Sequence, residues 1–246
     1  MRGLLLETLT WTEAEACLTR DTVVVIPLGA ACKEHGLHLP LNNDWLMAEY
    51  LKQRVLNELE GIVVAPTIAY HFFPAFIEYP GSISLRLETA SDLIVDICNS
   101  LARFGPRKFY VLNTGVSTLK PLGIARGELA AGGITLHYAD LEKLLEPVKH
   151  MQAQAGGGHA DEVETSIMLY MAPDVVNMSK ATNEFRDGPG RLTRDKNNRE
   201  GVLSESGVWG DATLATKEKG RAFTEALVAG ILKDIEEMKI SNNIEI

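Results

Sequence analysis

The chain has 246 residues, of which 46% are apolar and 23% charged, and its formal net charge is −9. Such a chain can bury a sizeable core in one large domain or two small ones. The acidic balance argues against a broad surface for nucleic acid or anionic membranes, because both need clustered Lys and Arg. Three separated cysteines, no signal-peptide pattern and no apolar run long enough to cross a membrane predict a reduced, cytoplasmic protein.

In its first half the chain alternates between helical patterns and buried apolar runs. We expect a helix over 10–20, a strand over 22–31, a helix over 44–59, a strand over 61–70, a helix over 89–104 and a strand over 108–115. The helix over 89–104 is expected to begin at Thr89 or Ser91, because hydroxyl side chains cap helix N-termini.

The second half continues the alternation. A strand over 133–141 leads into a helix over 141–154, a further helix follows the glycines at 156–158, and a closing helix runs from 215 or 217 to 239. The polar stretch 177–210 is expected to be a long surface loop or lid. Since strands alternate with helices, we predict an α/β fold with a mostly parallel sheet, formed by residues 1–246 as a single domain.

A first candidate site follows the strand over 22–31, where a parallel sheet binds its ligands. His35, His38 and Asp44 lie close together there, and imidazole and carboxylate are preferred ligands of zinc, manganese and iron. The alternative is that Asp44 caps its helix and the histidines bond loop carbonyls. No glycine-rich nucleotide-binding motif follows any predicted strand.

A second candidate site lies in GGGHADEVET, where His159 follows three glycines. A histidine there can transfer protons near neutral pH. Asp161 and Glu162 are expected to favour the helix N-terminus, whereas Glu164 is open to either a structural or a functional role. His71, among aromatic residues, is expected to be structural or to line a pocket wall.

Several segments resemble the creatininase (creatinine amidohydrolase) family, in the same order along the chain. IPLGAACKEHGLHLPLNND resembles the family's PxGSxEQHGPHLPxxxD, and YPGSISLRLET its FPGTISL segment. ARFGPRKFYVLNTG resembles the strand leading to NGHGGN, HADEVETSIMLYMAPDVV the HAGExETSLML segment, and GVWGDATLATKEKG the GVxGDPTLAT stretch.

The resemblance implies a three-layer α/β/α sandwich, often a hexamer, that hydrolyses amide C–N bonds with one or two divalent metals per chain. It assigns His35 and Asp44 as metal ligands, with Asp44 bridging two ions, and His159 as the proton-transfer residue. His38 is expected to lie next to the metal ligands and orient them without binding the metal itself.

Two departures from the family pattern concern the ligands. The family spaces its glutamate two residues before the histidine, where this chain has Lys33, so we expect a local bulge to bring Glu34 into the ligand position. If the segment stays regular, Lys33 points inward and competes with the cation. Gly115 takes the place of the NGHGGN histidine, and Glu164 or His71 is expected to compensate, or one metal only to bind.

The leading expectation is a metal-dependent amidohydrolase acting on a small cyclic or linear non-peptide amide. Zinc, manganese or iron would be held by Glu34, His35, Asp44 and Glu164, with Glu34 and His159 taking part in catalysis. Thr114 and Gly115 could offer backbone N–H groups to the substrate or oxyanion. A homo-oligomer is expected, without nucleic acid or membrane partners. The alternative is a metal-free binding or scaffold protein of the same fold.

Overall fold

Five parallel strands form the central sheet in the order β1-β3-β2-β4-β5. A computed structural model describes residues 3–188 and 191–241 of the chain. The strands are β1 (Leu4–Leu5), β2 (Val23–Leu28), β3 (Ile62–Val64), β4 (Lys108–Asn113) and β5 (Thr135–Tyr138). Four of them lie within the predicted strand segments, and the short edge strand β1 was not predicted.

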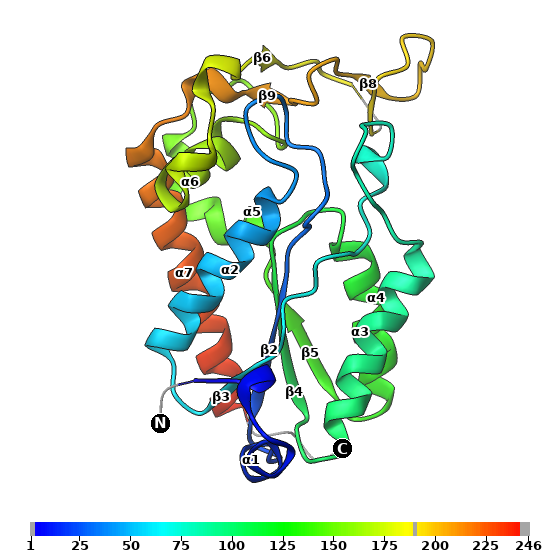
Figure 1. Cartoon of the computed structure of the whole chain (residues 1–246), viewed down its shortest axis with the longest axis vertical. Helices are drawn as coiled ribbons and strands as arrows, with labels where there is room; N and C mark the ends of the chain where they lie inside the picture. Colours follow the sequence, from blue (N-terminus) through cyan, green and yellow to red (C-terminus); the bar gives the residue numbers. More distant parts are fainter. Residues whose placement is uncertain (1–2, 189–190, 242–246) are drawn as a thin grey trace.

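Helices cover both faces of the sheet (Figure 1). One face carries α2 (Asn43–Glu58), α5 (Leu141–Leu145), α6 (Glu162–Met171) and α7 (Lys217–Ile240), and the other carries α3 (Leu87–Ala102) and α4 (Leu119–Ala131). Alternate residues of a strand serve opposite layers: Val23 and Val25 pack towards α2 and α7, whereas Val24 packs towards α3 and α4. The α/β architecture is therefore as predicted.

Two predicted helix boundaries need correction, and one helix was missed. Helix α4 falls in a stretch for which no element was predicted. Helix α3 begins earlier than expected, after Arg86, and no side chain caps its N-terminus. The helix expected over 141–154 stops at Leu145 and continues as the 3₁₀ helix η3 (Glu146–Met151). The short helix α1 (Trp11–Cys17) begins after Thr10, which forms a capping box with Glu13.

The segment 177–210, predicted as a loop or lid, contains short strands in its described part. Here β6 (Asn183–Glu184) pairs antiparallel with β9 (Gly210–Asp211), and β7 (Leu192–Thr193) pairs with β8 (Val202–Leu203). The short 3₁₀ helices in and around this region are η4 (Pro173–Val175), η5 (Met178–Lys180) and η6 (Ala212–Leu214). β7 and β8 pack on aromatic residues of the loop after β3, which includes η2 (Pro74–Phe76). The segment lies above the carboxyl ends of the sheet strands (Figure 1).

The strand order reverses at β2, which has β3 on one side and β4 on the other. The chain leaves β2 through α2 on one face and reaches β4 through α3 on the other. Loops that depart in opposite directions leave a crevice at the carboxyl ends of β2 and β4, where open α/β sheets bind ligands. Among the described residues, no helix is both long and apolar enough to cross a membrane.

Candidate metal centre

The loop after β2 brings His35 onto the first turn of α2. Its imidazole lies with Nε2 2.7 Å from Asp44 Oδ1 and Nδ1 2.9 Å from the Lys33 carbonyl oxygen. A Cβ atom at Gly29 would collide with the Asp44 backbone, so glycine is required where α2 approaches the end of β2. Both side chains are fully buried. The local sequence therefore builds a dry, rigid histidine–carboxylate pair.

Asp44 does not cap α2, contrary to the structural alternative considered for it. The N-cap position is occupied by Asn42, and the Asp44 carboxylate instead contacts His35 and, through Oδ2, the Lys33 ammonium at 2.7 Å. Burial alone would raise the pKa of Asp44, but the neighbouring His35 and Lys33 hold it well below its ordinary value. Asp44 is therefore a carboxylate at neutral pH.

Lys33 and Glu34 both reach the site, although the sequence presented them as alternatives. The Glu34 side chain lies with Oε2 3.1 Å from His159 Nε2, and its other oxygen accepts from the Gly36 N–H. Gly36 has a φ of +71°, which glycine adopts without strain, and its N–H faces the Glu34 carboxylate. Glu34 therefore lies beside His159, and the Lys33 ammonium lies beside Asp44.

His159 lies between two carboxylates. Its Nε2 faces Glu34, and its Nδ1 lies 3.6 Å from Glu164 Oε2. Burial favours the neutral ring, but Glu34 and then Glu164 raise the pKa of His159 above its ordinary value. Its ring also packs on Phe76, with centroids 4.3 Å apart.

Helix α6 supplies Glu164 from its first turn. Asp161 is the N-cap and accepts from the Val163 and Glu164 N–H groups, which confirms its expected structural role. Glu162 is also structural, because its carboxylate accepts from the Ala153 and Gln154 N–H groups. Glu164 is the acidic residue of this turn that faces His159, and its Oε2 also accepts from the Ala160 N–H.

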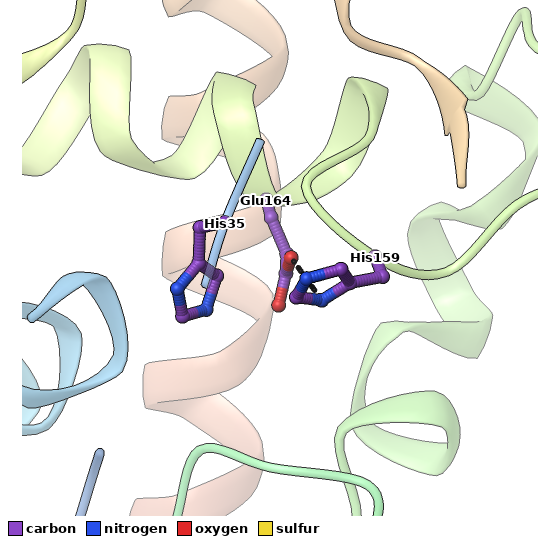
Figure 2. Close-up of side chains that lie close together, drawn as sticks. All are labelled: His35, His159 and Glu164. Atoms are coloured by element: carbon purple, nitrogen blue, oxygen red, sulfur yellow. Dashed lines mark ion pairs between the residues drawn. The ribbon is translucent and has the colours of Figure 1, made fainter. Parts of the chain in front are cut away.

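The donor atoms of His35, His159 and Glu164 all lie within 4.8 Å of one another. In Figure 2 the Glu164 carboxylate lies between the two imidazole rings. Two imidazoles and a carboxylate at this separation fit a divalent transition metal. The residues paired with them, Asp44 and Glu34, add two further carboxylates.

His38 and His71 lie outside this cluster. His38 Nε2 is 2.7 Å from the Thr165 hydroxyl, so it braces the helix that carries Glu164, and burial lowers its pKa to about 4. The Nε2 of His71 bonds the Ala90 carbonyl at 3.0 Å, and burial lowers its pKa to about 4 as well. His71 therefore joins α3 to the loop after β3 and does not replace a missing ligand.

Thr114 and Gly115 do not present free N–H donors, which corrects their expected role. The Thr114 N–H donates to the Leu28 carbonyl, and the Gly115 N–H donates to Asn113 Oδ1 at 3.2 Å. Instead, the Thr114 hydroxyl donates to the carbonyls of Leu28 and Asp44. Thr114 thus joins the end of β4 to the start of α2, which carries Asp44.

Part of the segment 177–210, expected to be a long surface loop or lid, lies against the site residues. A Cβ atom at Gly207 would collide with the Glu34 carboxylate, and one at Gly36 would meet Val208. Gly207, with a φ of +85°, lets its loop lie directly on Glu34.

A comparison with family models matches the creatininase (creatinine amidohydrolase) model over residues 7–235. The chain belongs to the creatininase family. It is 28% identical to the creatinine amidohydrolase of Pseudomonas putida, over 93% of this chain and 95% of that protein. It is 30% identical to the mycofactocin precursor peptide peptidase of Mycobacterium tuberculosis, over 83% of this chain and 81% of that protein. These creatininase-family relatives are hydrolases.

Solved creatininase structures share the whole fold. A manganese form superposes with a TM-score of 0.81 at 24% identity, covering 98% of this chain and all of that one. A mutant described as a Zn-Zn type superposes with a TM-score of 0.78 at 24% identity, over the same shares of the two chains. The creatininase-like α/β/α architecture is thereby confirmed.

Proposed function

We propose that this protein is a metal-dependent amidohydrolase that cleaves a C–N bond of a small cyclic or linear amide. The observation that supports it most is the buried cluster of His35, His159 and Glu164, flanked by the carboxylates of Glu34 and Asp44. Family membership adds support, because an amidohydrolase and a peptidase are among the relatives. The manganese and zinc forms among the solved neighbours support a divalent metal.

We assign His35, Asp44, Glu34 and Glu164 to holding the metal. When bound, a divalent cation would polarise the amide carbonyl and lower the pKa of a water molecule. The Lys33 carbonyl lies 2.9 Å from Nδ1 of His35 and orients the ring so that Nε2 faces Asp44, the neighbouring proposed ligand.

We assign His159 to proton transfer to the leaving nitrogen. Its position between Glu34 and Glu164 favours the protonated ring, which can donate a proton to the leaving nitrogen. Phe76 packs on one side of this ring, and Gly207 and Val208 lie over the neighbouring loop, so water is excluded around the proton donor. A small substrate and a homo-oligomeric, hexameric assembly belong to the same proposal.

The test is metal analysis of protein purified without chelator, followed by hydrolysis assays. We expect zinc, manganese or iron in the protein, and release of an amine from a panel of lactams and linear formamides. Treatment with EDTA should abolish the release, and adding the metal back should restore it. Protein that neither contains nor takes up a divalent metal would refute the proposal and favour a metal-free binding or scaffold role.

A further inference from the structure

Lys33 places a positive charge inside the proposed metal site. Its side chain is only 5% exposed, and its ammonium lies 2.7 Å from Asp44 Oδ2. The same ammonium lies over the Phe76 ring, 4.9 Å from the centroid, and 5.8 Å from that of Phe73. Since aromatic faces and a carboxylate surround the ammonium, Lys33 is a buried part of the site.

Both oxygens of Asp44 are already engaged. Oδ1 lies 2.7 Å from His35 Nε2, and Oδ2 faces the Lys33 ammonium at the same distance. A cation that used Asp44 on its Oδ2 side would therefore have to displace a buried ammonium. Displacing it would leave the charge of Lys33 without its partner, which is costly away from water.

The end of β4 offers no replacement ligand beside Asp44. Gly115 has no side chain, its N–H donates to Asn113, and its carbonyl accepts from Asn113 Nδ2 and the Thr118 hydroxyl. The Thr114 hydroxyl is likewise used on backbone carbonyls. The polar groups of Thr114 and Gly115 at the end of β4 therefore form hydrogen bonds within the protein.

The net charge of the site also favours a single divalent cation. Glu34, Asp44 and Glu164 contribute three carboxylates, and Lys33 contributes one ammonium. These four groups leave two negative charges, and the protonated His159 proposed above leaves one, so a single divalent cation already balances or exceeds the charge of the site. A second divalent cation would leave an excess of positive charge in a buried site, where unpaired charge is strongly unfavourable.

We infer that Lys33 acts as a resident cation of the site and limits it to one divalent metal per chain. The inference rests on the proposed metal-dependent function and goes beyond it in assigning the second positive charge to a side chain. Lys33 is a positioning residue here: it holds Asp44, and through Asp44 the imidazole of His35.

The experiment is a calorimetric titration of metal-free protein with Mn²⁺, repeated with Zn²⁺, in the wild type and in three Lys33 variants. We expect one equivalent per chain in the wild type and in Lys33→Arg, which keeps the charge. Lys33→Glu replaces the ammonium with a ligand and should take up two equivalents. Lys33→Met removes the repulsion of the cation and should bind one equivalent at least tenfold more tightly.

Lys52 provides a matched control, because it is a buried lysine paired with a carboxylate, Glu49 at 2.7 Å, away from the site. Lys52→Met should leave stoichiometry and affinity unchanged. Two equivalents in the wild type would overturn the inference while leaving the metal-dependent function intact. No metal in the wild type would overturn both.

Circular dichroism identifies any variant that does not fold. If Lys33→Glu and Lys33→Met fold but bind exclusively one equivalent with wild-type affinity, the inference is wrong. If neither folds, the wild-type stoichiometry decides alone, with one equivalent in favour and two against.

Discussion

His35 and Asp44 share a fully buried contact of 2.7 Å between Nε2 and Oδ1, formed across the junction between the β2 loop and α2. The contact depends on the close approach at Gly29 and on the Thr114 hydroxyl, which bonds the Asp44 carbonyl. His35 is therefore held by groups from three parts of the chain, and its replacement affects ligand chemistry more than packing.

His35→Ala should abolish metal binding, and Asp44→Asn should weaken it by about 10- to 100-fold, because the amide keeps the shape but not the charge. Metal content after dialysis against a metal buffer measures both. His150→Ala, at an exposed histidine of η3, is the control and should retain the full content. Wild-type metal content in His35→Ala would contradict the assignment.

His159 should make the metal-free protein lose stability as the pH rises. Because its folded-state pKa lies above 6.5, the folded protein holds this proton more tightly than the unfolded chain. The resulting stability is fully present below pH 6.5 and is lost as pH rises through the folded pKa. Denaturant unfolding in EDTA should show the advantage in unfolding free energy of wild type over His159→Gln shrinking as pH rises above 6.5. An advantage that grows with pH would show that the proton is not held there.

His71 should make the stability of the protein depend on pH in the opposite sense, with stability lost on the acidic side. Its pKa falls from 6.5 to about 4 on burial, so between these values the unfolded chain binds more protons than the folded protein. Stability is therefore lost as pH falls from 6.5 to 4, by about 3 kcal/mol at most. His71→Gln should flatten this part of the stability curve in the same unfolding assay. A wild-type slope in the variant would exclude His71 as its source.

Gly220 tests the contact between α6 and α7. A Cβ atom at this position would collide with the Ser166 carbonyl, so Gly220→Ala should destabilise the protein by about 1–3 kcal/mol. Gly127, exposed in α4 with nothing near its Cβ position, is the matched control. Gly127→Ala should stabilise by about 0.5–1 kcal/mol, because alanine favours helices. Thermal melts compare the two, and equal shifts would refute the close approach.

Prediction of the fold from the sequence was most accurate where the hydrophobic pattern is strong. The β-branched run at 23–26 predicted β2, and the apolar face of 44–59 predicted α2 within a residue at each end. Helix α4 escaped because Pro121, Gly123 and Gly127 resemble loop signals, although Leu122, Ala125 and Leu129 form its buried side. Tertiary packing overrides such local signals.

The site was only partly predictable for a different reason. Motifs identified Glu34, His35, Asp44, His159 and Glu164, but which atoms meet depends on backbone angles that spacing does not fix. Lys33 contacts Asp44 and Glu34 contacts His159, so both side chains reach the site, although the sequence presented them as alternatives. The occupied N–H groups of Thr114 and Gly115 likewise depend on their three-dimensional neighbours.

The long sequence separation between Glu34 and His159, 125 residues, has a consequence for synthesis. A growing chain exposes Glu34, His35 and Asp44 long before their partners on the α6 side exist, and the Gly207 loop follows later still. Contacts so distant in sequence form late in folding, because the intervening chain must first be ordered. If the proposed metal binds, the complete site can take it up only after the α6 side has been synthesised and folded, so metal uptake would report the last stage of folding.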